Sequence, residues 1–242
     1  MVYFLIPVYN EALNMADLAS SLLSVLPGEE KFFVFVDDAS TDHTVVQIRK
    51  LFPAPSLTIL QKEKNAGPGD SFNLGMEWIL ENCQEEHALL VSLEGDNTSD
   101  LAILPQLIAS VRLGNDVALA SVYLDGGRFE QTSWFKKVVS GIANASIRLA
   151  FGLKIHTLSS FYRVYSLGIL RRVKRQFGVL IAETGFVCMV ELIVKIVGAG
   201  GKVIEIPTVL HSSRRKGSSK MNMLRTTFGY LRFIVRQLGR RT

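Results

Sequence analysis

The chain alternates short apolar runs with polar turns and helical patterns. The apolar runs occupy residues 2–8, 31–36, 57–60, 88–93 and 117–123. Between them lie helical patterns at about residues 12–26, 42–52, 71–83 and 101–113. Short apolar runs bounded by polar residues predict buried parallel strands, and their alternation with helices predicts a doubly wound α/β sheet.

The second half of the chain is less regular. Helical patterns cover residues 133–151 and 183–197, a short basic helix follows residue 165, and residues 202–209 predict a last strand. No linker interrupts the pattern, so we expect one domain over residues 1–211, with halves at about 1–123 and 124–211. Residues 212–242 form an appendage of a different character.

This appendage is strongly basic. It holds nine basic and no acidic residues, whereas the rest of the chain has 18 basic and 22 acidic ones, a net charge of −4. Such asymmetry indicates an anionic partner for the tail: lipid headgroups, phosphates or nucleic acid. If the tail is helical, one apolar stripe runs along it, made of Met221, Leu224, Phe228, Leu231, Val235 and Leu238. A basic amphipathic helix of this kind favours a membrane surface, and the alternative is that the stripe packs on the protein body or on a second copy.

Composition restricts the compartment. Two cysteines, Cys83 and Cys188, give no disulfide framework and fit a reducing environment. The N-terminus has neither a basic region nor a small-residue cleavage site, so no signal peptide is expected. The most apolar long stretch, residues 186–201, contains Glu191 and Lys195, so no membrane span is predicted either.

Acidic residues follow three of the predicted strands. Glu11 comes after the first, Asp37 and Asp38 end the second, and Glu94 and Asp96 follow the fourth with one glycine between them. In a parallel sheet these ends lie on one edge, where carboxylates repel one another unless a cation or hydrogen bonds offset their charge. A divalent metal ion with a bound nucleotide would offset the negative charge and use the hydrogen-bonding groups at this edge. The alternative is that these acids form turns and helix caps, with Asp42 or Thr41 capping the helix that follows.

Other motifs are weak. Asn65-Ala66-Gly67-Pro68-Gly69 matches neither the dinucleotide fingerprint nor the P-loop, and alone it indicates a helix-entry turn. The four histidines share no ligand spacing. Lys136, Ser140 and Asn144 fall on one helix face. Taken without further context, Lys136 is a solvated charge and Arg163 belongs to a structural ion pair.

In combination, these motifs resemble family 2 nucleotide-sugar glycosyltransferases of the GT-A fold, and within them dolichol-phosphate or polyprenol-phosphate mannosyltransferases. The matching segments are Pro7-Val8-Tyr9-Asn10-Glu11, Val36-Asp37-Asp38-Ala39-Ser40-Thr41-Asp42, Asn65-Ala66-Gly67-Pro68-Gly69 with Asn73 and Gly75, and the acidic pair at Glu94 and Asp96. Looser matches are Ser121-Val122-Tyr123 with Gly126-Gly127, the set Lys136, Ser140, Asn144, Arg163 and Glu191, and Arg214 with Gly217, Ser219 and Lys220. The resemblance covers about residues 2–222.

The resemblance implies a role for particular residues. It implies a nucleotide-sugar site in the first half, with Pro7, Tyr9, Glu11, Asp38, Gly67, Glu94 and Gly95, and an acceptor site in the second half. Glu94 and Asp96 would hold Mg²⁺ or Mn²⁺ and the diphosphate. Lys136, Ser140, Arg214 and Lys220 would hold an acceptor phosphate. Asp96 and Arg163 would be catalytic.

The chain departs from the family pattern at four positions. Glu94 replaces the usual first Asp of the acidic pair, so its carboxylate reaches one methylene further. Val122 stands where the subgroup often has an arginine for the acceptor phosphate. Thr157 and Phe161 stand where an Asp and a Gly are common. The departures concern the acceptor half more than the nucleotide half.

Together these observations predict a metal-dependent glycosyltransferase at the cytoplasmic face of a membrane. It would move a hexose from a nucleotide sugar to a polyprenyl-phosphate carrier, with inversion, and the basic tail would allow for a separate membrane-spanning partner. One alternative is transfer to a glycan in surface-polysaccharide assembly, which needs a carboxylate base that the sequence does not single out. Another is a nucleotide-sugar-binding protein without turnover. Nucleic-acid binding is disfavoured because the tail lacks interleaved stacking aromatics.

Overall fold

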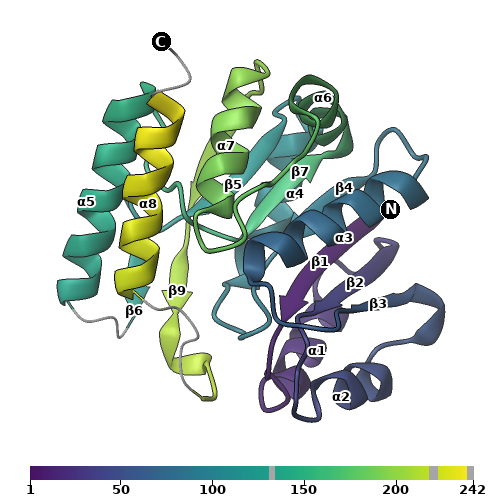
Figure 1. The fold of residues 1–242 in the computed structure, drawn as a ribbon. Helices are drawn as coiled ribbons and strands as arrows, with labels where there is room; N and C mark the ends of the chain where they lie inside the picture. The colour runs from purple at the N-terminus through teal and green to yellow at the C-terminus, as the bar shows by residue number, and fades with distance from the viewer. Residues whose placement is uncertain (131–133, 218–222, 239–242) are drawn as a thin grey trace.

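The central feature of the computed structural model is a seven-stranded sheet with helices on both faces (Figure 1). The structure describes residues 1–130, 134–217 and 223–238, with only some of the side chains in helices α5 and α8. The sheet order is β3-β2-β1-β4-β7-β5-β8. Its strands are β1 Val2–Val8, β2 Lys31–Asp37, β3 Leu57–Gln61, β4 Leu89–Ser92, β5 Val117–Ser121, β7 Arg163–Ser166 and β8 Val203–Pro207. A separate pair, β6 Arg128–Glu130 and β9 Val209–His211, is also parallel.

Helices cover both faces of this sheet. They are α1 Met15–Ser24, α2 Thr44–Leu51, α3 Pro68–Asn82, α4 Leu104–Arg112, α5 Trp134–Phe151, α6 Leu167–Phe177, α7 Cys188–Gly198 and α8 Met223–Leu238. Buried side chains of α1, α2 and α4 form one core cluster, and those of α3, α5, α6, α7 and α8 form the other. None of the helices, over the residues described, is long and apolar enough to cross a membrane.

Strand β1 shows why the sheet has two cores. Tyr3 and Leu5 pack into the cluster of α3, whereas Val2, Phe4 and Ile6 pack into the cluster of α1 and α4. Both faces are therefore buried, and the strand is apolar at every position from Val2 to Ile6, as expected for the interior of a parallel sheet. The sequence prediction of a mostly parallel, doubly wound sheet is confirmed.

Strand β7 was not predicted. It pairs antiparallel with β4 on one side and with β5 on the other, so it interrupts an otherwise parallel sheet. Its four residues begin with the charged Arg163, so the segment does not show the continuous apolar pattern of a buried strand and resembles a polar turn. Because β7 runs against its neighbours, the segment that precedes it arrives at the edge where the parallel strands end.

Helix α7 begins at Cys188 and not at residue 183, where the pattern had placed its start. The Glu191 carboxylate accepts hydrogen bonds from the backbone N–H groups of Ala182 (2.8 Å) and Glu183 (2.7 Å). Lys195 pairs with the other carboxylate oxygen of Glu191 at 2.7 Å. Glu191 thus satisfies two N–H groups of the loop that precedes α7 and ties this loop to the helix.

The beginning of α3 is fitted closely against this loop. Gly67 has φ +95° at the N-cap of α3, and the N–H of Gly69 donates to the carbonyl oxygen of Thr184 at 2.8 Å. A Cβ on Gly69 would overlap the carbonyl oxygen of Glu183 and lie 2.8 Å from the Cβ of Cys188. The glycines at these positions therefore allow two backbone segments to touch.

We predict that Gly69→Ala lowers the free energy of unfolding by about 2 kcal/mol, since the clash is with backbone and cannot be relieved by a rotamer change. Gly168→Ala in α6 is the matched control: its nearest neighbour is a side-chain oxygen 4.0 Å away. The control should be neutral or stabilising, by at most about 0.5 kcal/mol. Urea unfolding measures both, and equal stability of the two variants would contradict the close fit of α3 against the loop.

Candidate active site

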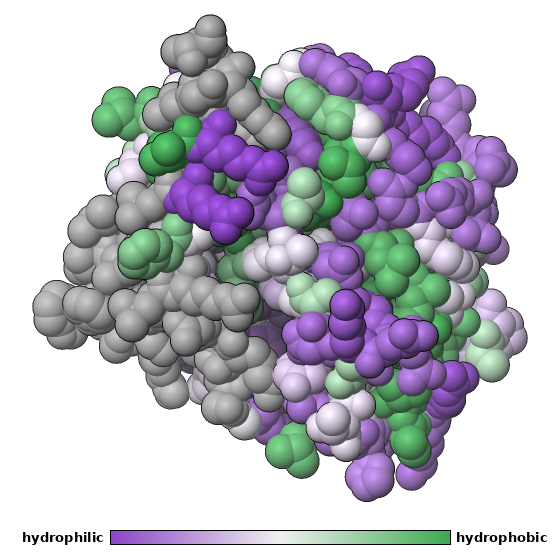
Figure 2. Space-filling model, in the orientation of Figure 1, coloured by the Kyte–Doolittle hydropathy of each residue, from purple (hydrophilic) through white to green (hydrophobic). Residues whose placement is uncertain are grey.

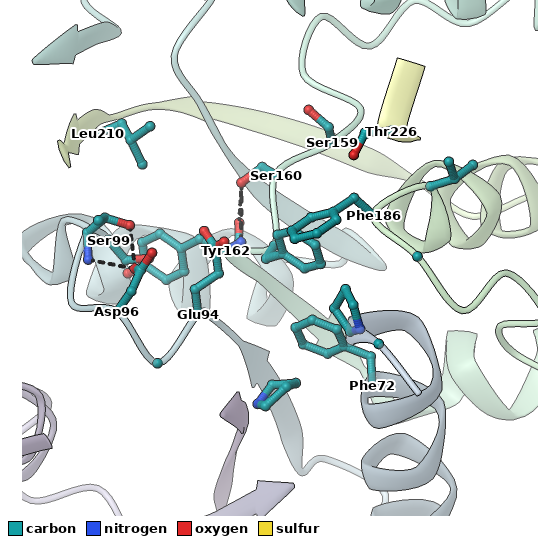
Figure 3. Close-up of a pocket in the computed structure, with 18 of the residues that line it drawn as sticks. Phe72, Glu94, Asp96, Ser99, Ser159, Ser160, Tyr162, Phe186, Leu210 and Thr226 are labelled. Carbon is teal, nitrogen blue, oxygen red and sulfur yellow. Dashed lines mark hydrogen bonds between the residues drawn. The ribbon is translucent and has the colours of Figure 1, made fainter. Parts of the chain in front are cut away.

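The carboxyl ends of β1, β2 and β4 open onto a cavity of about 1050 Å³. All the residues predicted to bind the nucleotide sugar line it: Pro7, Tyr9, Glu11, Asp38, Gly67, Glu94 and Gly95, together with Asp96. Its other end reaches α8 at Phe228, Tyr230 and Arg232. In Figure 3, Glu94 and Asp96 lie on one side of the cavity, with Phe72 and Phe186 on the other.

Asp96 is held on both of its carboxylate oxygens. Oδ1 accepts hydrogen bonds from the backbone N–H (3.1 Å) and the hydroxyl (2.7 Å) of Thr98. Oδ2 accepts from Arg215, through Nε at 2.7 Å and through a close Nη2 contact. Gly95 permits this turn to approach β1, since a Cβ there would lie 2.8 Å from Val8 Cγ1. The acidic turn is therefore a fixed and largely buried arrangement.

Glu94 lies in the same turn, where burial and neighbouring carboxylates disfavour its ionised form. Burial, the neighbouring carboxylate of Asp96 and, more weakly, that of Glu11 raise the pKa of Glu94 to about 8, against the opposing charge of Arg215. Burial disfavours the charge on Arg215, yet the carboxylates of Asp96, Glu94 and Glu11 together raise the pKa of Arg215 above its ordinary value. The turn thus has more negative charge than one guanidinium balances.

These donors suit a hard divalent cation. Mg²⁺ is usually held by one or two carboxylates together with substrate phosphates and water, and Glu94 and Asp96 are such a pair. Among the described residues, no group of three or more His, Cys, Asp and Glu side chains could enclose a metal ion. A cation here would therefore take its remaining oxygen ligands from water or from a bound diphosphate.

Asp38 is used to shape the neighbouring loop. Its two oxygens accept hydrogen bonds from the N–H groups of Ala66 and Gly67, each at 2.9 Å. Lys62 pairs with Asp38 at 2.6 Å and with Asp70 at 2.5 Å. The carboxylate therefore fixes the turn before α3 at the edge of the cavity.

The alternative interpretation of the acids as caps holds for one of them. Asp42 accepts hydrogen bonds from the N–H (2.9 Å) and hydroxyl (2.5 Å) of Thr44 at the start of α2. Glu11 makes a different contact, accepting a bond of 2.5 Å from the side-chain amide of Asn14. Asp37 in turn accepts a hydrogen bond from the N–H of Ser40 at 3.2 Å and does not line the cavity. The acids therefore divide into those that only form a turn or a cap and those that face the cavity.

The wall between the acidic turn and α8 was missed by sequence reasoning. Glu205 in β8 accepts hydrogen bonds from the N–H groups of His156 (2.7 Å) and Thr157 (2.8 Å). The Thr157 hydroxyl bonds that of Ser121 at 2.6 Å. Asn144 in α5 accepts from the N–H of Leu158 at 3.1 Å. Four hydrogen bonds thus fix this segment; Ser121, Asn144 and Thr157 are among the residues named from the sequence, whereas Glu205 is not.

Aromatic side chains make this wall apolar. The rings of Phe72 and Phe161 stack with centroids 5.1 Å apart, and Phe186 meets Phe161 edge-on at 5.8 Å. Phe161 is the residue found where a glycine is common, so the departure adds a ring to the wall. Tyr162 contributes a buried hydroxyl that has no partner among the described residues.

Of the residues predicted to bind the acceptor phosphate, the structure describes only part. The side chains of Lys136 and Ser140 and the whole of Lys220 lie outside the described residues. Arg214 is exposed in the short 3₁₀ turn Ser212–Arg214 and does not line the cavity, whereas its neighbour Arg215 does. The roles proposed for Lys136, Ser140, Arg214 and Lys220 stay predictions, and the structure adds Arg215 to the cavity.

The prediction that Arg163 is catalytic does not fit its position. The side chain is fully buried at the start of β7 and does not line the cavity. Its guanidinium donates to three backbone carbonyl oxygens, of Leu158 (2.6 Å), Ser160 (2.7 Å) and Met189 (3.0 Å). Arg163 therefore ties the cavity wall to α7, and its catalytic role stays a prediction. Its guanidinium binds backbone carbonyls and forms no ion pair with a described residue, in contrast to the structural alternative.

Comparison with known proteins places these features in a family. Residues 3–174 match the family model described as Glycosyl transferase family 2. Polyprenol monophosphomannose synthase of Mycolicibacterium smegmatis is 26% identical over 90% of this chain and 80% of its own length. Dolichol-phosphate mannosyltransferase of Pyrococcus furiosus is 28% identical over 97% of this chain and 63% of its own length. Undecaprenyl-phosphate mannosyltransferase of Micrococcus luteus is 26% identical over 91% and 87%.

Solved structures show the same fold. Glucosyl-3-phosphoglycerate synthase from Mycobacterium tuberculosis, in complex with phosphoglyceric acid, superposes with a TM-score of 0.69 at 14% identity over 97% of this chain and 79% of that one. The same protein with Mn²⁺, uridine diphosphate and glucosyl-3-phosphoglycerate gives a TM-score of 0.66 at 14% identity, with the same coverage of both chains. At this identity the likeness establishes the fold alone, and the predicted GT-A fold is confirmed.

The position of Arg163 generates a stability prediction. Arg163→Leu should lower the free energy of unfolding by about 3 kcal/mol or more, because three carbonyl oxygens lose their donor in a buried site. Arg175→Leu on the exposed side of α6 should change it by no more than about 0.5 kcal/mol. Thermal unfolding followed by circular dichroism compares the two. Unchanged stability of Arg163→Leu together with abolished turnover would restore the catalytic assignment.

Proposed function

The chain belongs to glycosyl transferase family 2, and from this premise we propose that it transfers a hexose from a nucleotide sugar to a polyprenyl-phosphate carrier. That it is a glycosyltransferase follows from the family. The carrier is inferred from relatives whose names specify polyprenol, dolichol or undecaprenyl phosphates and that match 90% or more of this chain. The observation that carries the proposal is one cavity that joins the acidic turn to the amphipathic helix α8.

The donor would bind at the edge formed by β1, β2 and the turn before α3. Pro7, Tyr9 and Glu11 would contact base and ribose, while Asp38 holds the turn at Gly67 that encloses them. Glu94 and Asp96 would hold Mg²⁺ or Mn²⁺ against the diphosphate. When bound, the cation would neutralise the charge that develops on the leaving diphosphate.

The acceptor phosphate would enter from the side of α8. A phosphate oxygen is already ionised, so it needs positioning by cations and no general base. Lys136, Ser140, Arg214 and Lys220 remain the candidates for this task. The phosphate oxygen would attack the anomeric carbon from the face opposite the diphosphate, with inversion, and the nucleoside diphosphate would depart. The aromatic wall of Phe72, Phe161 and Phe186 would keep water from competing.

The tail would rest on a membrane surface that carries the acceptor. Phe228 and Val235 of the predicted stripe are 76% and 72% exposed. Arg232 and Arg236 are exposed on the same helix. Figure 2 shows hydrophobic and strongly hydrophilic residues side by side on the part of the molecule where α5 and α8 lie. An exposed face of this composition supports binding to an anionic interface by insertion and charge attraction. We propose that the interface is the cytoplasmic face of a membrane.

A donor and acceptor screen tests the proposal. Purified protein is incubated with radiolabelled GDP-, UDP- and dTDP-hexoses, Mg²⁺ or Mn²⁺, and short polyprenyl phosphates. Label that moves into the lipid phase identifies both substrates. Label that moves only into an added glycan would replace the lipid acceptor with a sugar hydroxyl, and nucleotide binding without any transfer would indicate a protein that binds nucleotide sugars without turnover.

We expect Asp96→Ala to lower turnover at least about a hundredfold while the fold remains, because Arg215, its partner, is partly exposed and can be solvated. Glu94→Asp should largely keep turnover, since aspartate also offers a carboxylate to the cation. Asp125→Ala in an exposed turn is the control and should leave turnover unchanged. Metal-dependent turnover of Asp96→Ala close to the parent rate would refute the assignment of the cation.

Helix α8 allows membrane binding and packing to be tested separately, because its two faces differ. Phe233 is 1% exposed and packs on Phe151 with ring centroids 5.7 Å apart, so removing the whole helix would also disturb the core. Substituting Phe228 and Val235 with Ser avoids this. We predict that the double variant keeps its thermal stability but loses about a hundredfold in partitioning to anionic liposomes, at roughly 1.5 kcal/mol for each side chain.

Phe233→Ser is the matched control for this experiment. It should lower thermal stability and leave the exposed face of α8 unchanged. Co-sedimentation with liposomes at low and high salt reports binding. If the parent protein ignores liposomes at every salt concentration, the exposed stripe serves another contact.

A further inference from the structure

Residues Ser212–Gly217 form a segment tied at two neighbouring positions to opposite sides of the acidic cavity. The segment follows β9, and it contacts the β4 side through Arg215 and the α1 side through Lys216. We call this segment the strap. Its residues are all described, and Ser212 and Arg215 line the cavity.

The first tie is ionic. Arg215 donates through Nε (2.7 Å) and Nη2 to a single carboxylate oxygen, Oδ2 of Asp96. Its side chain is 25% exposed, and the carboxylates of Glu94 and Glu11 also act on it. The guanidinium is therefore the positive charge present where a divalent cation would have to bind Asp96.

The second tie is made by the side-chain amide of Asn14. Asn14 is 1% exposed and precedes α1, where an asparagine normally caps the helix through its side chain. Here its amide makes no such cap. Instead its oxygen accepts from the N–H of Lys216 at 2.8 Å, and its nitrogen donates to the carbonyl oxygen of Lys216 at 3.0 Å. The Asn14 side chain thus binds both the N–H and the carbonyl oxygen of Lys216.

Both ties lie next to the candidate nucleotide-sugar site. The same amide nitrogen of Asn14 donates to Glu11 at 2.5 Å, and Glu11 lines the cavity beside the acidic turn. A cation that binds Asp96 would therefore compete with the first tie, whereas a nucleotide sugar that contacts Glu11 would act on the residue bonded to Asn14. The first tie thus uses the carboxylate that the cation would require, and the second lies next to Glu11.

We propose that the strap is a latch: Arg215 takes the place of the cation on Asp96 in the absence of donor, and a divalent cation releases the strap by displacing it. This rests on the proposed function of Asp96 as a cation ligand. One divalent ion balances the clustered carboxylates better than one guanidinium. The released Arg215, with Arg214 and Lys216 on the same segment, becomes available for phosphate. Donor and cation consequently bind before the acceptor.

The first test measures Mn²⁺ affinity without nucleotide, by electron paramagnetic resonance of the free ion. Arg215→Gln removes the competing charge and should raise Mn²⁺ affinity about tenfold. Lys216→Ala is the matched control: it removes the exposed ion pair with Asp17 and keeps both backbone bonds to Asn14. The control should bind Mn²⁺ like the parent. Unchanged or weaker Mn²⁺ binding by Arg215→Gln overturns the latch.

The second test follows the strap itself by hydrogen exchange of peptides that cover residues 212–217. The N–H of Lys216 should be protected in the parent protein, and Mn²⁺ should accelerate its exchange. Asn14→Ala should give fast exchange with or without Mn²⁺. Exchange that Mn²⁺ leaves unchanged in the parent overturns the latch.

These measurements separate the latch from the proposed function. If the parent binds Mn²⁺ through Asp96, as judged by its loss in Asp96→Ala, while Arg215→Gln and the strap amides do not respond, the latch fails and the function stands. If neither the parent nor Arg215→Gln binds Mn²⁺, with or without a nucleoside diphosphate, the cation assignment fails, and the latch fails with it.

Discussion

Mutual repulsion among carboxylates at one edge of the sheet is the constraint on which the site depends. Parallel strands end on the same side, so Glu11, Glu94 and Asp96 face one cavity whatever their separation in sequence. Their charge cannot be left unbalanced in a partly buried place. Protonation of Glu94, ion pairing with Arg215 and coordination of a cation are three ways to balance it, and they exclude one another in part.

The walls of the cavity are loops, yet buried polar side chains hold them to the sheet and its helices. Asp38, Glu191 and Glu205 each accept two backbone N–H groups, and Arg163 donates to three carbonyl oxygens. Such side chains satisfy backbone groups that no helix or strand satisfies. The cost of burying their charge is offset because each binds several partners at once. A pocket made of irregular segments thereby acquires a definite shape.

Sequence periodicity predicted the parallel strands and their helices well, because burial on both faces leaves a continuous apolar run. It failed for β7, where a buried arginine is satisfied by backbone carbonyls of Leu158 and Ser160 in the preceding segment and of Met189 in α7. It also failed at the start of α7, since Glu191 acts on N–H groups eight and nine residues earlier. For the site, acidic residues at strand ends were found by topology alone. Arg215 was not singled out, because only the three-dimensional path of the strap decides which residue of this basic segment meets Asp96.

The direction of β7 has a consequence for how the pocket is assembled. In a purely parallel sheet, only segments that follow strands reach the catalytic edge. An antiparallel strand delivers the segment that precedes it, so residues 156–162 enter the pocket from the opposite direction along the chain. The acidic turn and the aromatic wall of the cavity are then built from separate pieces of chain. The shape of that wall can therefore change by replacing side chains in one short segment, such as Phe161, while the strands that carry the acidic turn remain as they are.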